Sequence, residues 1–251
     1  MNVLVIREFE NFSRMLIAGD ATVINCPTIR TSQTEDVLDL EDKLKRLDSF
    51  DGIFLTSRKA AEIFRKKHRE YNLRFRGRVY VFGKRGFNVL KNEGFDLYGD
   101  TAAGTVQEML DAIAPAKLAN KRFLIICGEN ALPTVVDHLS PIATVERTVV
   151  YRTETMLVGP ALREKVVTLA KRGEIALACF FSPSGAASFL SQFGAGLLCG
   201  TKVAVIGKTT AEYFARANIR VDLISEKPDA ADLANAVLKF QRFRSLTTAV
   251  H

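Results

Sequence analysis

The chain has 251 residues, of which 47% are hydrophobic and 25% charged, a balance typical of a folded globular protein and not of a disordered one. The length favours two domains of ordinary size. No apolar run approaches the ~18 residues that a membrane-spanning helix needs, and the first residues lack the basic start and long apolar stretch of a signal peptide. We therefore expect a cytoplasmic enzyme or binding protein with no membrane partner.

Short β-branched runs alternate with segments of helical periodicity along the whole chain. Strands are predicted at Val3–Ile6, Thr22–Cys26, Gly52–Thr56, Val79–Phe82, Phe95–Tyr98, Phe123–Cys127, Ala143–Val150, Ala176–Phe181, Lys202–Ile206 and Val221–Ile224. Apolar residues recur at helical spacing in segments such as Val106–Ile113 and Leu233–Phe240. The alternation predicts an α/β fold with parallel sheets covered by helices on both faces.

The sequence also repeats itself once. The segment from Gly52 resembles the segment from Leu177 at an offset of 126, and Gly83 matches Gly207 at an offset of 124. At the second offset Gly94 falls on Asn218, and both follow a helix at a point where left-handed backbone is expected. One α/β unit therefore occurs twice, which predicts two similar domains.

Two polar, β-branched stretches without helical period, Pro27–Ser32 and Val149–Thr155, lie between the repeats. We expect the chain to cross between the domains there and the two crossings to pair as a short two-stranded ladder. A ligand would then bind in the cleft between the domains, at the carboxyl ends of the strands. The predicted division is domain 1 at residues 1–28 and 154–251, domain 2 at 33–148, and linkers at 29–32 and 149–153.

The net charge of +7 comes from 35 Lys and Arg and 28 Asp and Glu, and the excess is local. Nine Arg or Lys and only two Glu lie between Arg58 and Arg78. This stretch is either a solvated helix face or a patch that attracts an anion. We expect no nucleic-acid partner, because no RNA-binding aromatic strand and no zinc-finger spacing accompanies it.

Cofactor motifs are weak or fail on spacing. The run Gly207-Lys208-Thr209 resembles the end of a phosphate-binding loop, but the first glycine of that motif would stand at Lys202. The scattered histidines and cysteines form no metal-ligand cluster. We expect no ATP, NAD or metal site, and we interpret the cysteines as small core residues: Cys26, Cys127, Cys179 and Cys199.

Hydroxyl-bearing and glycine residues occur where predicted strands pass into helices. Such corners expose free backbone N–H groups and the positive end of the helix dipole. Plain N-capping by Ser or Thr is the alternative interpretation, and one helix start can do both. The corners are Thr56-Ser57, Ser182-Pro183-Ser184-Gly185 and Gly207-Lys208-Thr209-Thr210. Several of them facing one cleft would suit a ligand with many carboxylates.

Four segments, in the right order and spread over nearly the whole chain, resemble the uroporphyrinogen-III synthase family: FLTSRKA (Phe54–Ala60), VYRT (Val150–Thr153), FFSPSG (Phe180–Gly185) and VIGKTTA (Val205–Ala211). The resemblance implies two α/β domains joined by a two-stranded linker. It also implies a cyclising lyase that converts hydroxymethylbilane to uroporphyrinogen III, with loss of water and inversion of ring D, and that needs no metal or organic cofactor. That substrate is a polyanionic tetrapyrrole with eight carboxylates.

The resemblance also implies roles for particular residues. Tyr151 matches the family's linker tyrosine and is the catalytic candidate, expected to assist departure of the substrate hydroxyl. Lys59 stands where relatives often have Arg. Cys127-Gly128-Glu129 stands where many relatives read Arg-Gly-Glu, which weakens the case for an anion contact there. The residues expected to bind substrate are Thr56, Ser57, Lys59, Lys84, Ser182, Ser184, Gly185, Gly207, Lys208, Thr209 and Thr210.

We expect a monomer that can receive its substrate by transient hand-over from hydroxymethylbilane synthase. The chemistry asks the protein mainly to hold the reacting ring in place, which agrees with the lack of an obvious catalytic triad. The rival hypothesis is a non-catalytic two-domain binding protein for an anionic ligand, since duplicated α/β domains with a hinge serve that purpose too.

Overall fold

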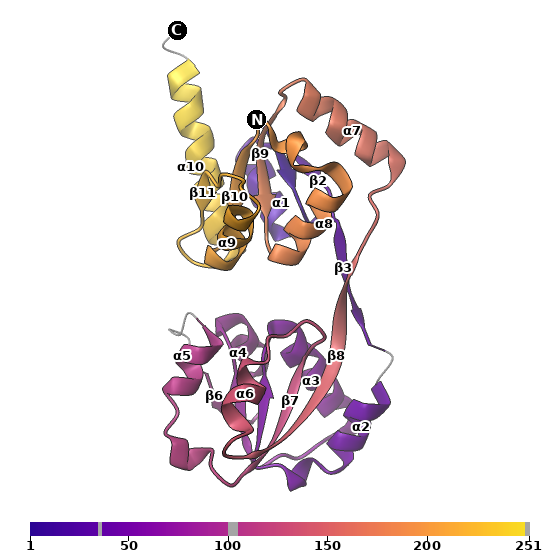
Figure 1. Cartoon of the computed structure of the whole chain (residues 1–251), viewed down its shortest axis with the longest axis vertical. Helices are drawn as coiled ribbons and strands as arrows, with labels where there is room; N and C mark the ends of the chain where they lie inside the picture. The colour runs from indigo at the N-terminus through magenta and orange to yellow at the C-terminus, as the bar shows by residue number, and fades with distance from the viewer. Residues whose placement is uncertain (35–36, 100–104, 249–251) are drawn as a thin grey trace. The chain divides into compact units, whose positions relative to one another are not determined.

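The computed structural model describes residues 1–34, 37–99 and 105–248. The chain forms two compact units, each built around its own sheet (Figure 1). Unit 1 consists of Met1–Arg30 and Glu154–His251, and unit 2 consists of Thr31–Thr153.

Unit 1 contains a five-stranded sheet in the order β11-β10-β9-β1-β2, and all its neighbouring strands pair in parallel. The strands are β1 Asn2–Val5, β2 Thr22–Asn25, β9 Ile175–Phe180, β10 Lys202–Val205 and β11 Leu223–Ile224. The helices are α1 Asn11–Ala18, α7 Pro160–Lys171, α8 Pro183–Phe193, α9 Lys208–Arg216 and α10 Ala230–Thr248, with a short 3-10 turn at Ala195–Leu198.

Successive strand residues of unit 1 point to opposite faces of its sheet, as the period of two requires. Leu4 and Phe180 pack with α7, α8 and α9 on one face. Val3 and Cys179 pack with α1 and α10 on the other face. The sheet is therefore covered on both sides, which explains why its strands read as nearly continuous apolar runs.

Unit 2 contains a six-stranded sheet in the order β3-β8-β7-β4-β5-β6. The strands are β3 Ile29–Gln33, β4 Gly52–Leu55, β5 Arg78–Val81, β6 Asp96–Tyr98, β7 Arg122–Gly128 and β8 Thr144–Thr155. The helices are α2 Val37–Lys45, α3 Arg58–Tyr71, α4 Lys84–Leu90, α5 Val106–Asp111 and α6 Thr134–Leu139, with 3-10 turns at Leu47–Ser49 and Pro115–Lys117.

The two faces of this second sheet are also buried. Ile53 and Leu124 pack with α2, α3 and α4, whereas Phe54 and Ile125 pack with α5 and α6. Strands β4 to β8 pair in parallel. The predicted α/β fold class, with two parallel sheets flanked by helices, is confirmed.

Strands β3 and β8 form the predicted two-stranded linker. Hydrogen bonds join Met156 to Thr28 and Thr34 to Val150, so the two strands run antiparallel. Strand β8 runs as one 12-residue strand through Tyr151 to Thr155 and does not end at Val150 as predicted. Its alternating sequence TVERTVVYRTET favours an unbroken strand.

The internal repeat is visible in the backbone. Gly94 and Asn218 both have left-handed backbone, with φ of 80° and 54°, as the repeat predicted. The predicted offset of 126 is wrong by one residue at the first corner. Ser57 and Ser182 are the N-caps of α3 and α8, and they lie 125 residues apart because β4 ends at Leu55 and β9 at Phe180.

The core interpretation is confirmed for three of the four cysteines and wrong for Cys199, which is exposed in the turn before β10. Burial raises the pKa of the Cys26 thiol to about 12 and also raises that of Cys179, so neither is a ready nucleophile. Within the described ranges, the side chains form no group of three or more potential metal ligands.

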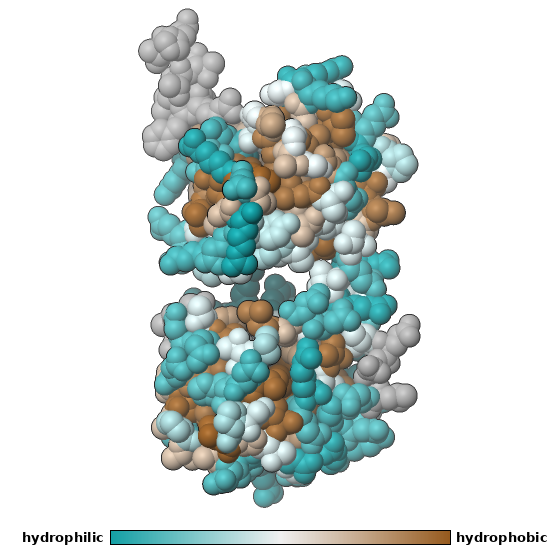
Figure 2. Space-filling view, viewed as in Figure 1, coloured by the Kyte–Doolittle hydropathy of each residue, from teal (hydrophilic) through white to brown (hydrophobic). Residues whose placement is uncertain are grey.

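No helix in the described part of the chain is long and apolar enough to cross a membrane. On the face shown in Figure 2, hydrophilic side chains (teal) are spread over both units and hydrophobic ones (brown) lie among them.

Candidate functional site

The first corner of interest joins β4 to α3 in unit 2. Ser57 is the N-cap of α3, and its Oγ accepts a hydrogen bond from the Ala60 N–H at 3.2 Å. Thr56 and Ser57 are half-buried, and Lys59 is exposed in the first turn of the helix. In the described ranges Lys59 has no carboxylate partner, so its ammonium group is available to a ligand.

Tyr151 of β8 reaches this corner from elsewhere in the chain. Its hydroxyl lies 3.0 Å from the Oγ of Ser57 and donates a hydrogen bond to it, and the two residues are 94 positions apart. The ring is partly buried against the core that contains α3. The structure therefore brings the catalytic candidate and one predicted binding residue into direct contact.

Gly128, the last residue of β7, makes room for that tyrosine. The register of β7 against β8 shifts between Cys127 and Gly128, so that Gly128 pairs with Tyr151. A Cβ at position 128 would lie 2.5 Å from the Cζ of Tyr151, closer than real Cβ atoms come. Position 128 must therefore be a glycine for the Tyr151 ring to lie where it does. We call Thr56, Ser57, Lys59, Gly128 and Tyr151 the α3 corner.

Arg147 supports the α3 corner from β8. Its Nε lies 3.1 Å from the Sγ of Cys127, and its Nη2 donates to the carbonyl oxygen of Glu129 at 3.1 Å. Sequence reasoning found no arginine at position 127 and overlooked this one. The register shift between Arg147 and Tyr151 puts their side chains on opposite faces of the sheet, since Cys127 packs on the α5 and α6 side and Tyr151 on the α3 side, so the strand period gave no signal for Arg147.

The second corner joins β9 to α8 in unit 1. Ser182 is the N-cap of α8, and its Oγ accepts from the Gly185 N–H at 3.0 Å. Ser184 is exposed, and its Oγ lies 3.1 Å from that of Ser182. Gly185 is buried. The two serines therefore present hydroxyl groups at the carboxyl end of β9, as predicted.

The third corner joins β10 to α9. Gly207 is the N-cap of α9, and no side chain caps this nine-residue helix, so its first N–H groups are not occupied by a cap. Lys208 and Thr209 are exposed, whereas Thr210 is only 2% exposed. Lys84, the predicted binding residue of the matching position in unit 2, is exposed at the start of α4.

Arg7 and Phe181 lie at the carboxyl ends of β1 and β9. The guanidinium carbon of Arg7 is 4.5 Å from the centre of the Phe181 ring, and Arg7 also forms an ion pair with Glu10. Sequence reasoning did not select Phe181. Phe181 directly precedes Ser182, so it borders the corner formed by Ser182, Ser184 and Gly185, which we call the α8 corner.

The basic stretch is partly neutralised by the fold. Four of its cations are in ion pairs: Arg58 with Glu62, Lys67 with Glu41, Arg69 with Glu93 and Arg78 with Asp96. The Arg69 guanidinium holds the pKa of Glu93 below its usual value. Lys59 and Lys66 have no carboxylate partner within the described ranges. Four of the nine cations are thus paired with carboxylates, and among the others Lys59 lies at the α3 corner.

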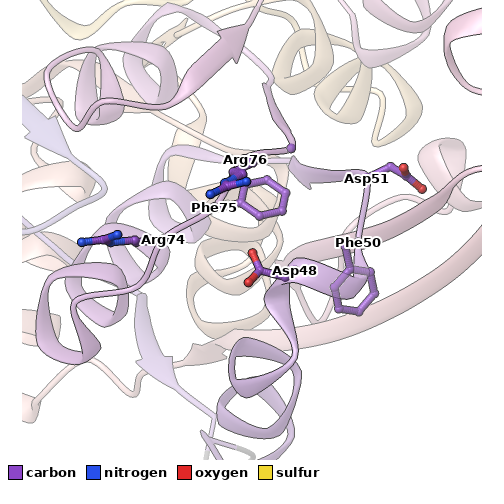
Figure 3. A pocket seen from close by; sticks show the side chains of 7 residues that line it. Asp48, Phe50, Asp51, Arg74, Phe75 and Arg76 are labelled. Carbon is purple, nitrogen blue, oxygen red and sulfur yellow. The ribbon is translucent and has the colours of Figure 1, made fainter.

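A hollow of about 600 Å³ lies at the amino ends of strands of the unit 2 sheet (Figure 3). Asp51 and Gly77, which precede β4 and β5, are among its lining residues, so it lies at the amino ends of these strands. Asp51 accepts a hydrogen bond from the Arg122 N–H at 2.8 Å, which gives its carboxylate a structural task. The α3 corner lies at the other end of β4.

Comparison with known proteins gives one family. The model described as Uroporphyrinogen-III synthase HemD matches residues 10–235. A uroporphyrinogen-III synthase from Chlorobaculum parvum is 28% identical over 200 residues, covering 76% of this chain and 80% of the relative.

Solved structures show the same fold. A mutant uroporphyrinogen III synthase from the extremely thermophilic bacterium Thermus thermophilus has a TM-score of 0.66 at 16% identity, covering 96% of this chain and 98% of the other. Uroporphyrinogen-III synthetase from Helicobacter pylori 26695 has a TM-score of 0.63 at 15% identity, covering 95% and 99%. Since the family model spans most of the sequence, the chain belongs to the uroporphyrinogen-III synthase family.

Proposed function

We propose that this protein cyclises hydroxymethylbilane to uroporphyrinogen III, with loss of water and inversion of ring D, and that the α3 corner is where the substrate hydroxyl departs. Family membership over residues 10–235 supports the reaction. The 3.0 Å hydrogen bond between Tyr151 and Ser57 is the observation that supports the site.

Departure of the hydroxyl needs a hydrogen-bond donor and little other machinery. An electron-rich pyrrole can expel the oxygen once that oxygen receives a proton. Proton transfer from a positioned side chain typically contributes ~10²–10⁴-fold to the rate. The phenol of Tyr151 is the group proposed to assist this step.

Ring D must then attack through a carbon that already carries a substituent, which is a problem of positioning. Holding reacting groups in place can contribute ~7–11 kcal/mol. We propose that the substrate carboxylates are held by the α3 corner, by Lys84, by Ser182, Ser184 and Gly185, and by Gly207, Lys208, Thr209 and Thr210. Exposed hydroxyls, lysines and the uncapped start of α9 support this assignment.

The proposal also covers the organisation of the protein. Residues 1–28 with 154–251 and residues 33–148 act as two domains, joined at 29–32 and 149–153. The protein is a cytoplasmic monomer that receives its substrate by transient hand-over from hydroxymethylbilane synthase. Light scattering of the purified protein would test the monomer, and a dimer mass would contradict it.

The experiment that tests the function is an isomer assay. The protein is incubated with enzymatically generated hydroxymethylbilane, the products are oxidised, and isomers I and III are separated by chromatography. Isomer III is expected. Isomer I alone, with tight binding of the product, would instead favour a non-catalytic binding protein for an anionic ligand.

A further inference from the structure

The hydrogen bonds at Ser57 leave one donor unused. A serine hydroxyl has one hydrogen and two lone pairs. The Oγ of Ser57 accepts from the Ala60 N–H at 3.2 Å and from the Tyr151 hydroxyl at 3.0 Å, so both lone pairs are occupied. With the Tyr151 hydroxyl as the donor of that bond, no other acceptor for the Ser57 hydrogen occurs among the residues that the structure describes. This hydrogen remains for a ligand.

Tyr151 shows the complementary pattern. Its single hydroxyl hydrogen is donated to Ser57, so in this arrangement it has none to give to a substrate directly. Its oxygen keeps free lone pairs. The pair therefore presents one donor, on Ser57, beside one acceptor, on Tyr151. A hydroxymethyl group, which both donates and accepts, has the matching chemistry.

The geometry of the pair is enforced on two sides. Ser57 is fixed as the N-cap of the 14-residue helix α3. The Tyr151 ring lies where a side chain at Gly128 would stand, and its inner side packs against the core. The two hydroxyls are thus preorganised before any ligand binds, as an efficient site requires.

We infer that Ser57, and not Tyr151, is the residue that donates a hydrogen to the departing hydroxyl of the substrate, and that Tyr151 acts through Ser57. This inference rests on the proposed function. As the carbon–oxygen bond breaks, its electron pair goes to the oxygen, which takes the hydrogen of Ser57, and Ser57 takes the hydrogen of Tyr151. Water leaves and Tyr151 carries a negative charge. Ring D then attacks through its substituted carbon, which forms a carbon–carbon bond, and the older bond from that carbon to its methylene bridge breaks. The bridge bonds to the free α-carbon of ring D, and the proton released from that carbon returns to Tyr151, so only one water is lost.

A double-mutant cycle in the full chain tests this transfer of hydrogen from Tyr151 through Ser57 to the substrate, which we call the relay. Tyr151→Phe and Ser57→Ala are each expected to lower kcat by about 10²-fold, with a smaller change in KM. The double variant is expected to be no slower than Ser57→Ala, within about twofold, because Tyr151 has no other route to the substrate. If the two losses multiply, Tyr151 acts independently of Ser57 and the inference is wrong. It is also wrong if either single variant keeps wild-type kcat.

Two variants separate the relay from helix capping. Ser57→Thr keeps both the hydroxyl and the cap and is expected to restore kcat to within about tenfold of wild type. Thr105 is the N-cap of α5, and its Oγ1 accepts a hydrogen bond from the Glu108 N–H at 3.1 Å, so Thr105→Ala removes a comparable cap. It is expected to lower thermal stability without changing kcat. A kcat loss in Thr105→Ala equal to that in Ser57→Ala would mean that lost capping explains both.

Gly128→Ala gives a test that leaves Ser57 and its cap intact. The added Cβ forces the Tyr151 ring away from Ser57, so kcat is expected to fall about as far as in Tyr151→Phe, and no further when the two changes are combined. Wild-type kcat in Gly128→Ala would overturn the inference. Formation of isomer III by the wild type tests the proposed function separately, since that result does not depend on which hydroxyl donates.

Discussion

The buried hydroxyl of Thr28 donates a hydrogen bond to the carbonyl oxygen of Gly185 at 3.1 Å, across 157 positions of sequence. The carbonyl oxygen of Thr28 in turn accepts from the Ser188 hydroxyl at 2.6 Å and from the Met156 N–H at 2.7 Å. The segment that leads into β3 is therefore fastened to helix α8, whose first turn forms the α8 corner. The position of that corner depends on a buried polar contact.

Replacing Thr28 with Val should destabilise unit 1. The substitution keeps the shape of the side chain but removes a donor from a fully buried site, which typically costs ~1–3 kcal/mol. Urea unfolding should show a lower midpoint. Thr22→Val, on the exposed face of β2, is the matched control and should change stability by less than about 0.5 kcal/mol. Equal midpoints for the two variants would contradict the structural role of the Thr28 hydroxyl.

Glu146 of β8 accepts hydrogen bonds from two arginines of unit 2. Its carboxylate lies 2.7 Å from the Nη2 of Arg46 and 2.6 Å from the Nη2 of Arg122. Both guanidinium groups also lie over the ring of Phe50, at 5.6 and 5.2 Å. The hydrogen bond from Arg46, followed by that from Arg122, lowers the pKa of Glu146 to about 2.

This pKa predicts a dependence of stability on pH. A carboxyl whose folded pKa is depressed stabilises the fold above its unfolded pKa, here 4.5, and loses that effect as the pH falls toward about 2. Glu146→Gln should therefore be less stable than wild type by roughly 1–2 kcal/mol near neutral pH, an amount reduced by solvent screening. The difference should close as the pH falls from about 4.5 to about 2. Glu164→Gln, at an exposed carboxylate of α7, should show no such difference at any pH.

The layered fold was predictable because strand and helix periods are local. Runs such as Phe123–Cys127 are short and apolar and contain β-branched residues, which favours a buried strand, and the repeat placed Gly94 and Asn218 at equivalent left-handed positions. The caps Ser57 and Ser182 were also recognisable, since a Ser after a strand and before a helical period is a local signal.

The contacts of the site were not predictable in the same way. Tyr151 meets Ser57 only because the register of β7 and β8 shifts at Gly128, and no local pattern encodes that shift. The one-residue error in the repeat offset has a different cause, because the two segments were aligned on their apolar residues, whereas their caps Ser57 and Ser182 align at an offset of 125. The burial of Thr210 follows from the phase of α9 against its sheet, which the adjacent threonines do not disclose.

Lys59 should contribute to substrate binding through its charge. Lys59→Glu is expected to raise KM more than it lowers kcat, because it places a negative charge at the α3 corner against a substrate with carboxylates. Lys66→Glu makes the same charge change on the same helix, two turns away from the corner, at an exposed lysine. Steady-state kinetics should show a larger KM effect for Lys59. Equal effects would mean that only the net charge of the protein matters.

Product binding should weaken as salt is added. Exposed Lys59, Lys84 and Lys208 all lie at helix starts, and attraction between exposed charges is screened within ~10 Å at 0.1 M salt. Titration with the product by fluorescence, at about 0.05 M and about 0.5 M salt, should give a higher Kd at the higher concentration. An unchanged Kd would argue that uncharged hydrogen bonds hold the carboxylates.

The two adjacent threonines of α9 should behave differently. Thr209 is exposed in the first turn of an uncapped helix, so its hydroxyl and N–H can both reach a carboxylate, whereas Thr210 is 2% exposed and offers mainly its N–H group. A hydrogen bond to a charged group is worth ~1.5–3 kcal/mol, so Thr209→Val should raise KM by about tenfold or more. Thr210→Val makes the same substitution at the same helix start but keeps the N–H group that Thr210 offers. It should leave KM within about threefold of wild type. If Thr210→Val has the larger effect on KM, the buried hydroxyl takes part in binding, and α9 must turn or shift when the substrate arrives.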